Sequence, residues 1–164
     1  MAITRPDTHS VPNPPAPLEP IPACGDVVVR VRYCECDPMG VAHHASYIPW
    51  LELGRTELLR ASGVSYADLE HAGVFLVVIK LAIRYRRPAR YDDEIAIATR
   101  VAGGGRARID HEYMVRRGAS AHALSTDAPE ELLATATSTL ACVDNTGKPR
   151  ALPDWLTAKA HTDS

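Results

Sequence analysis

The sequence lacks a long apolar run. The longest one, residues 74–79, is ended by Lys80 and is far shorter than the roughly 20 apolar residues that cross a bilayer as a helix. The N-terminal residues are polar and rich in proline, without the apolar stretch of a signal peptide. We therefore expect a cytoplasmic protein with no membrane span.

An excess of charge of one sign is also missing. The 164 residues include 18 Lys or Arg and 20 Asp or Glu, which gives a net charge of −2. This balance gives no electrostatic reason to expect a nucleic acid as partner. The four cysteines have neither zinc-site nor CxxC spacing, and we interpret Cys34 and Cys36 as packing residues at a strand end. We expect no metal and no other cofactor.

Prolines are abundant only near the N-terminus, where seven of the 13 lie between Pro6 and Pro22. A segment with so few large apolar residues cannot offset the entropy lost on ordering. We predict a flexible arm over residues 1–25 and one folded domain over residues 26–164. The alternative, a ligand for a proline-recognising domain, lacks a closely flanking basic residue.

The spacing of apolar residues predicts one long helix over residues 46–62. Ser46 is the expected N-cap, and Gly63 ends the helix. Apolar residues occur on several of its faces, which indicates that it is covered on more than one side. Gly54 costs about 1 kcal/mol relative to alanine in a helix interior, so we expect another element to pack closely there.

Alternating apolar residues predict strands that follow and precede this helix. They cover residues 27–33, 74–87, 94–101, 107–115 and 133–143, with a short helix over 66–71, a turn at glycines 103–105 and a polar loop over 117–130. The order of a strand, a long helix and then a meander indicates an α+β fold. An antiparallel sheet wrapped around the helix is its compact form.

Residues 33–47, between the first strand and the long helix, contain residue types that are typical of a catalytic site. Asp37 in this loop can act as a general base or as a nucleophile. The start of the helix offers unpaired N–H groups for a developing oxyanion. Asp37-Pro38-Met39-Gly40 is also an ordinary turn sequence, so the residues alone leave a structural and a catalytic interpretation open.

The same segment and the helix after it resemble the 4-hydroxybenzoyl-CoA thioesterase family of hotdog-fold proteins. The resemblance is strongest to the small acyl-CoA thioesterases associated with the Tol–Pal gene cluster, and it covers residues 27–153. The matching motifs are Asp37-Pro-Met-Gly40, His44-Ala-Ser-Tyr47, Trp50-Leu-Glu-Leu-Gly-Arg-Thr-Glu57, Arg84-Tyr-Arg-Arg-Pro-Ala-Arg90 with Asp92-Asp93, and Pro149-Arg-Ala-Leu-Pro153.

This resemblance implies a hotdog fold of about five strands that hydrolyses an acyl-CoA thioester. It places the catalytic carboxylate at Asp37 and an assisting histidine at His44. The implied substrate-binding residues lie around the turn and at the end of a strand, where arginine forks suit the phosphates of coenzyme A: Gly40, His43, Ser46, Tyr47, Arg86 and Arg87. The family also implies a homodimer or homotetramer with sites at the subunit interface.

Several alternatives stay open at this point. Glu52 and Glu57 each have an arginine three residues on, as in helix ion pairs, but some hotdog thioesterases use a helix glutamate. The arginines are also compatible with a solvated strand end. Acyl-carrier protein can replace coenzyme A as the thiol half. The alternative functions are a hotdog dehydratase or hydratase on hydroxyacyl thioesters, and a non-catalytic acyl-CoA or acyl-carrier binding protein.

Overall fold

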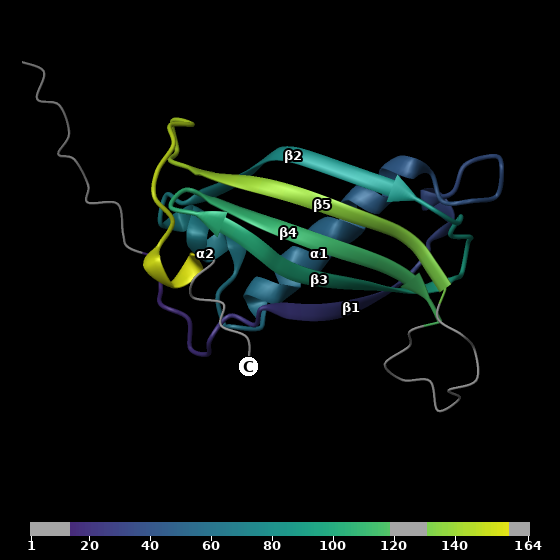
Figure 1. Ribbon diagram of the computed structural model, residues 1–164, viewed down its shortest axis with the longest axis horizontal. Helices are drawn as coiled ribbons and strands as arrows, with labels where there is room; N and C mark the ends of the chain where they lie inside the picture. The colour runs from purple at the N-terminus through teal and green to yellow at the C-terminus, as the bar shows by residue number, and fades with distance from the viewer. Residues whose placement is uncertain (1–13, 119–130, 158–164) are drawn as a thin grey trace, which may run out of the picture.

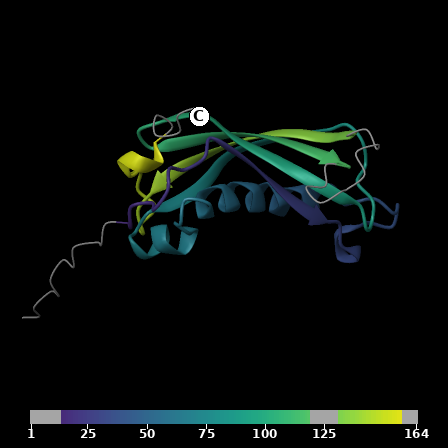
Figure 2. The ribbon, with the colours of Figure 1, turned by 90° about the horizontal axis from the view of Figure 1, so that it is seen from below.

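The structure, a computed structural model, describes residues 14–118 and 131–157. Five strands form one antiparallel sheet in the order β1-β3-β4-β5-β2 (Figure 1). The strands are β1 (Cys24–Arg30), β2 (Phe75–Tyr85), β3 (Glu94–Gly105), β4 (Arg108–Arg117) and β5 (Glu131–Val143). Helix α1 (Tyr47–Arg60) lies against one face, and the sheet curves over it (Figure 2). The predicted α+β architecture is confirmed.

Close packing between α1 and the sheet depends on Gly54. A Cβ atom at this position would lie 2.3 Å from Oγ1 of Thr99 and 3.2 Å from Cγ2 of Ile97. Both side chains come from β3, so the helix backbone approaches that strand more closely than any larger residue permits. This contact confirms the close approach that the glycine in the helix predicted.

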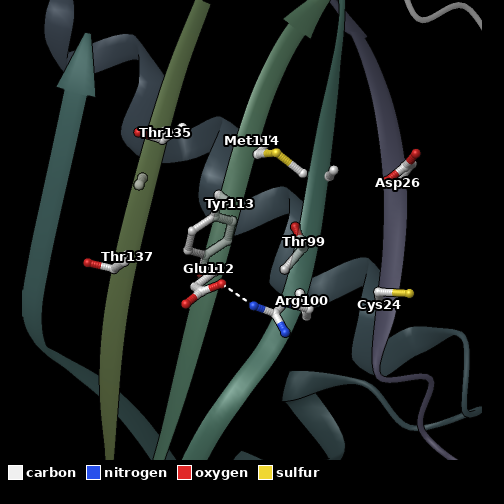
Figure 3. Close-up of a pocket in the computed structure, with 11 residues that line it drawn as sticks. Cys24, Asp26, Thr99, Arg100, Glu112, Tyr113, Met114, Thr135 and Thr137 are labelled. Atoms are coloured by element: carbon white, nitrogen blue, oxygen red, sulfur yellow. Dashed lines mark hydrogen bonds and ion pairs between the residues drawn. The ribbon is translucent and has the colours of Figure 1, made fainter. Parts of the chain in front are cut away.

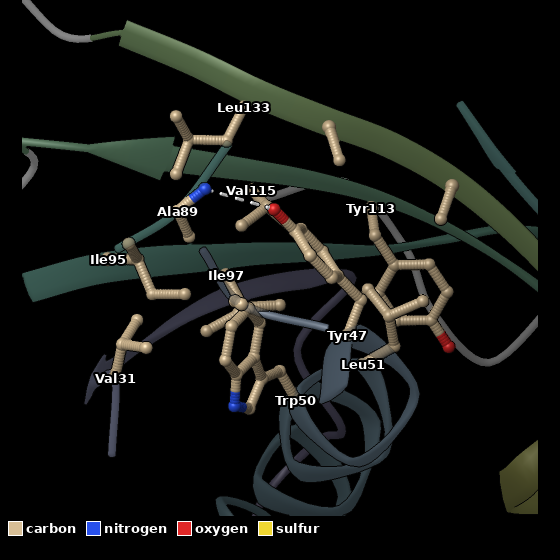
Figure 4. Packing of buried hydrophobic residues seen from close by; sticks show 13 residues of the cluster. Val31, Tyr47, Trp50, Leu51, Ala89, Ile95, Ile97, Tyr113, Val115 and Leu133 are labelled. Carbon is tan, nitrogen blue, oxygen red and sulfur yellow. Dashed lines mark hydrogen bonds between the residues drawn. The ribbon is translucent and has the colours of Figure 1, made fainter. Parts of the chain in front are cut away.

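The side chains between α1 and the sheet form two hydrophobic clusters. The first, here the helix-start cluster, surrounds the N-terminal half of α1 (Figure 4) and includes Val31, Tyr47, Trp50, Leu51, Ile95, Ile97, Tyr113, Val115 and Leu133. The second, here the helix-end cluster, includes Ile21, Leu59, Val64, Leu69, Val74, Ile109, Cys142, Leu152 and Leu156. Helix α2 (Tyr66–His71) and the 3-10 turn η3 (Asp154–Leu156) contribute to the helix-end cluster.

Glycines 103–105 differ from the predicted turn. They continue β3, where Gly103, Gly104 and Gly105 pair with β4 after a register shift that follows Val101. Alternating residues on β4 provide a strand partner, and this tertiary pairing overrides the local preference of glycine for turns. The chain therefore reverses only after Gly105.

Packed structure begins earlier than the predicted start at Asp26. Ile21 is buried in the helix-end cluster, the Leu18 N–H donates to the Ser62 carbonyl at 3.0 Å, and β1 begins at Cys24. Two buried residues, Pro14 and Ile21, and a few backbone hydrogen bonds anchor this stretch although its composition is poor in apolar residues. The rest of the predicted arm, residues 1–13, and most of the predicted polar loop lie outside the described residues.

At its C-terminal end, β1 stops at Arg30, before the predicted end at residue 33. A 3-10 turn, η1 (Tyr33–Glu35), follows. Among the described helices, none is long and apolar enough to cross a membrane.

Candidate active site

The loop between β1 and α1 is folded into a defined turn. The Gly40 N–H donates to the Asp37 carbonyl at 2.9 Å, and the Asp37 N–H donates to the Val41 carbonyl at 2.9 Å. Gly40 has a φ of +74°, a conformation that glycine adopts without steric cost. The turn predicted from the Asp-Pro-x-Gly sequence is therefore present.

The two oxygens of the Asp37 carboxylate have different surroundings. Oδ1 accepts the N–H of Met39 at 2.8 Å, whereas Oδ2 has no hydrogen-bond donor among the described residues. The bond to Met39 fixes the orientation of the carboxylate, and the second oxygen stays available to a substrate or a water molecule. Asp37 is half-buried, so a ligand can reach it.

Glu35 holds this loop through hydrogen bonds to its carboxylate and to its backbone carbonyl. Its carboxylate accepts hydrogen bonds from the backbone N–H of Arg32 at 2.7 Å, from the Arg32 guanidinium at 2.7 Å and from Nε1 of Trp50 at 3.0 Å. Its carbonyl accepts the His43 N–H and the Ser46 hydroxyl, both at 2.8 Å. Glu35, only 7% exposed, thus connects the end of β1, the loop and the start of α1.

Two opposing effects act on the pKa of Glu35. Burial alone raises the pKa of this carboxyl, but the hydrogen bonds from Arg32 and Trp50 outweigh it, so the pKa lies below its usual value. The group is therefore ionised at neutral pH. An ionised carboxylate with all these partners is a structural acceptor and is poorly suited to proton transfer.

Asp37 lies between two pockets. The first, here the arginine pocket, has a volume of about 370 Å³ and is lined by Asp37, Val41, Ala42, His44, Tyr47, Tyr85, Arg86, Arg87 and Pro88. The second, here the tyrosine pocket, has a volume of about 420 Å³ and is lined by Tyr33, Cys36, Asp37, Pro38, Gly40 and Tyr91. The structure therefore brings most of the site residues predicted from the sequence to one place.

His43 and Ser46 have local contacts instead. Nδ1 of His43 accepts the Ala45 N–H at 3.2 Å, and the Ser46 hydroxyl donates to Glu35. Ser46 makes no side-chain cap on α1, contrary to the prediction, because the Glu35 carbonyl takes its hydroxyl. Both residues hold the short 3-10 turn η2 (His44–Ser46) in front of α1.

The backbone N–H groups just before α1 differ in their acceptors. The N–H groups of His43, Ala45 and Ser46 donate to the Glu35 carbonyl, to Nδ1 of His43 and to the His43 carbonyl. Among the described residues, none accepts the His44 N–H. His44 lines the arginine pocket, so this donor is a candidate to polarise a carbonyl bound beside Asp37.

Tyr85, at the end of β2, is a pocket residue that the sequence did not indicate. Its hydroxyl donates to the His44 carbonyl at 2.9 Å, and its ring meets that of Tyr47 edge to face with centroids 5.0 Å apart. Burial raises its pKa. Because 41 residues separate Tyr85 from His44, no local pattern in the sequence signals this contact.

The two predicted arginines differ in what they contact. The backbone N–H groups of Arg86 and Arg87 both donate to the Leu133 carbonyl, at 2.8 and 3.1 Å. The Arg87 guanidinium forms an ion pair with Glu131 at 3.1 Å, whereas no described residue forms an ion pair with Arg86. Arg86 is therefore the better placed of the two to bind an anion.

The helix glutamates form ion pairs, as one of the two interpretations predicted. Glu52 pairs with Arg55 at 2.9 Å, and Glu57 pairs with Arg60. Neither glutamate lines the two pockets beside Asp37.

A larger cavity of about 570 Å³ lies on the face of the sheet that turns away from α1 (Figure 3). Its charged residues include Arg100 and Glu112, which form an ion pair with each other, and none of the predicted site residues lines it. In the described part of the chain, no group of three or more His, Cys, Asp or Glu residues is arranged to hold a metal ion.

A sheet wrapped around one helix, with an aspartate turn at the helix start, matches the hotdog-fold thioesterases that the motifs resemble. Comparisons with known proteins agree. The sequence model of the thioesterase-like superfamily matches residues 31–160. The putative acyl-CoA thioesterase YneP of Bacillus subtilis is 34% identical over 135 residues, which cover 79% of this chain and 91% of YneP.

Two further relatives are similarly close. The acyl-CoA thioester hydrolase YbgC of Escherichia coli is 35% identical over 133 residues, 80% of this chain and 91% of YbgC. The crystal structure of a probable thioesterase from Bartonella henselae has a TM-score of 0.69 at 33% identity and covers 80% of this chain and all of that one. This chain belongs to the thioesterase-like superfamily, and the family expected from its motifs is confirmed.

Proposed function

We propose that the protein hydrolyses an acyl-CoA thioester to a free acid and coenzyme A. The observation that carries the proposal is the asymmetric Asp37 carboxylate, with Oδ1 held by Met39 and Oδ2 free, in a pocket that also contains His44 and two arginines. The names of the relatives YneP and YbgC, an acyl-CoA thioesterase and an acyl-CoA thioester hydrolase, support this substrate class.

The chemistry follows from the groups beside the free oxygen. The thioester oxygen accepts the N–H of His44, which stabilises the negative charge that develops on it. As general base, Asp37 takes a proton from a water whose oxygen attacks the carbonyl carbon. The C–S bond then breaks, the proton passes to the thiolate, and the acid leaves. His44, which lines the same pocket, helps to position the carbonyl.

The same geometry also permits Asp37 to act as nucleophile. Its free oxygen then attacks the carbonyl carbon, the thiolate leaves with a proton from solvent, and a mixed anhydride remains. Water hydrolyses the anhydride and restores the carboxylate. Both routes need the ionised form of Asp37 and consume one water per thioester.

The remaining pocket residues suit the recognition of coenzyme A. Arg86 and Arg87 line the arginine pocket, where guanidinium groups can bind the phosphates. Tyr47 and Tyr85 line the same pocket, and Gly40 adopts the positive φ that the turn beside Asp37 requires. His43 and Ser46 contribute by holding the His44 N–H in place.

We further expect a homodimer or homotetramer. At one edge of the sheet, the side chains of Val77, Val78, Ile79 and Leu81 on β2 are between 36% and 61% exposed. At the other edge, Arg30 on β1 pairs with Asp92 and Glu94. Charged edges resist pairing, whereas a long apolar edge favours it, so β2 is the edge that a second copy is expected to cover. Light scattering that shows only a monomer at micromolar concentration contradicts this.

A thiol-release assay tests the function. Wild-type protein is incubated with short aliphatic, long aliphatic and aromatic acyl-CoA esters, and with the same acyl groups on acyl-carrier protein. Hydrolysis releases free thiol from at least one ester. A dehydratase changes the 2,3 bond of a hydroxyacyl ester without releasing thiol, and a binding protein retains the ester unchanged. Either of these results contradicts the proposal.

A further inference from the structure

The tyrosine pocket has no role in the chemistry above, although it shares Asp37 with the arginine pocket. A thioester has two halves that extend in opposite directions from its carbonyl carbon. When this carbon lies at Asp37, one half enters each pocket. The assignment of the halves therefore depends on which pocket suits the phosphates of coenzyme A.

The charges favour one assignment. The arginine pocket contains Arg86 and Arg87 and can hold an anionic chain. The tyrosine pocket contains no basic residue, and Asp37 is its charged group. Asp37 lines both pockets, so the arginines make the difference between them. Guanidinium groups bind phosphates, so the thiol half belongs in the arginine pocket and the acyl half in the tyrosine pocket.

Two aromatic rings form the wall of this second pocket. Tyr33 and Tyr91 meet edge to face, with centroids 5.7 Å apart and planes at 86°. Their side chains are nevertheless 81% and 58% exposed. Aromatic rings contribute to stability mainly when they are buried, so a pair so exposed contributes little to the fold, and its surface is free to contact a ligand.

The pair is also held in place by the backbone. Tyr91 precedes Asp92, whose N–H donates to the Val31 carbonyl at 3.0 Å and whose carbonyl accepts the Arg30 guanidinium at 3.0 Å. Tyr33 begins the 3-10 turn that Glu35 anchors. The backbone at both tyrosines is thus fixed before any ligand arrives, which lowers the cost of ordering this wall of the pocket on binding.

We propose that the tyrosine pocket is the acyl-group subsite, and that Tyr33 and Tyr91 make it prefer an aromatic acyl group to an aliphatic one. This inference rests on the proposed thioesterase function. A bound aryl ring can pack against both tyrosine rings in the offset or edge-to-face arrangements that aromatic rings favour. A short alkyl chain fits the same space but gains no such contact.

The test compares four substrates that separate the two halves of the thioester. Benzoyl and butyryl groups are each supplied as the coenzyme A ester and as the N-acetylcysteamine ester, which lacks the nucleotide. The variants are Tyr33→Leu and Tyr91→Leu. Tyr33→Phe is the matched control that keeps the ring, and Leu18→Ala removes an exposed apolar side chain at the far end of α1.

In wild type, we expect kcat/KM to be higher for the benzoyl than for the butyryl ester. Each Tyr→Leu variant should lower this benzoyl-to-butyryl ratio by about three- to tenfold, the effect of one aromatic pair. The loss should be the same for both thiol halves, because the nucleotide does not enter this pocket. Tyr33→Phe and Leu18→Ala should keep the wild-type ratio.

Three other results overturn the inference. An equal loss for benzoyl and butyryl esters means that the tyrosines do not distinguish acyl groups. A loss seen with coenzyme A esters but absent with N-acetylcysteamine esters means that the pocket holds the nucleotide. Unchanged ratios in both Tyr→Leu variants mean that the pocket holds neither half. Failure of wild type to release thiol from any ester overturns the proposed function itself, and the inference with it.

Discussion

The two hydrophobic clusters along α1 are built from different kinds of side chain. The helix-start cluster contains aromatic rings whose polar atoms form hydrogen bonds: Tyr47 accepts the Ala89 N–H at 3.3 Å, and Trp50 donates to Glu35, which holds the loop, at 3.0 Å. The helix-end cluster consists mainly of aliphatic residues such as Leu69 and Val74.

This difference indicates a division of roles. In the helix-start cluster, packing and the positions of catalytic groups are linked. A shift of the Trp50 ring would break its hydrogen bond to Glu35, and Glu35 holds the loop that carries Asp37. The helix-end cluster can change its packing without moving Asp37. Substitutions near the helix start should therefore change activity, and those near the helix end should change stability alone.

Of the substitutions near the helix start, Asp37→Asn should have the largest effect on activity. The amide can still accept the Met39 N–H, so the turn should survive, but it can act neither as base nor as nucleophile. We expect kcat/KM for thiol release to fall by about 10²- to 10⁴-fold, with an unchanged melting temperature. Glu52→Gln and Glu57→Gln are the controls, and a folded, active Asp37→Asn protein would assign catalysis to these helix glutamates instead.

Leu69→Ala should give the opposite result. Leu69 is 1% exposed, and truncation of such a leucine costs about 2–5 kcal/mol through lost burial and the cavity left behind. Urea unfolding should show this loss, while kcat/KM per folded molecule stays at the wild-type value. A large fall in kcat/KM without a loss of stability would break the proposed division between the clusters.

Gly54→Ala tests the contact at the middle of α1, where the two clusters meet. The new methyl group would overlap Oγ1 of Thr99, and overpacking of this kind costs about 1–3 kcal/mol. Adding Thr99→Ala removes the overlapping atom, so the double variant should be more stable than the sum of the single effects predicts. Strict additivity of the two unfolding free energies would show that the contact is not tight.

The helix-start cluster should also make stability depend on pH. The pKa of Glu35 is lower in the folded protein than in the unfolded chain, so its contribution is complete above the unfolded pKa and disappears as the pH falls through the folded pKa. Glu35→Gln should cost about 1–3 kcal/mol at pH 7, and the difference from wild type should shrink towards pH 3. Unfolding curves at a series of pH values measure it, with Glu57→Gln as control.

Arg86→Ala should have the smallest effect, and it should weaken substrate binding rather than slow the chemical step. An exposed ionic contact is worth up to about 1 kcal/mol, so KM for acyl-CoA should rise by up to about fivefold with little change in kcat. Arg87→Ala should do less, because Arg87 already pairs with Glu131. The N-acetylcysteamine ester, which has no phosphates, should be insensitive to both. Equal effects on both substrates would mean that the arginines are structural.

Much of the fold could be predicted because it depends on local patterns. Alternating residues located the strands, and helical spacing together with Gly54 located α1 and its close contact with the sheet. Local signals failed where a distant partner decided the structure. The glycines at 103–105 extend β3 because β4 lies opposite, and Ile21 packs although its neighbours are prolines and polar residues.

The candidate site shows the same limit. Asp37 and His44 are found by motif, since the turn and the helix start are local. Glu35 and Tyr85 are not, because each acquires its role from a partner brought near by folding: Trp50 in one case, and the carbonyl of His44, 41 residues earlier, in the other. A sequence reveals which groups can react more readily than which groups hold them in place.

The order of the strands also determines when the sheet can be completed. Among the described strands of one chain, β2 pairs only with β5. About 60 residues separate the ends of these two strands, which take about 3–12 seconds to synthesise at about 5–20 residues per second. During that interval, the apolar strand β2 has been synthesised but neither of its edges is paired. Slower translation past β4 lengthens this interval and with it the exposure of the nascent chain to aggregation, so synonymous codons in that stretch are expected to change the yield.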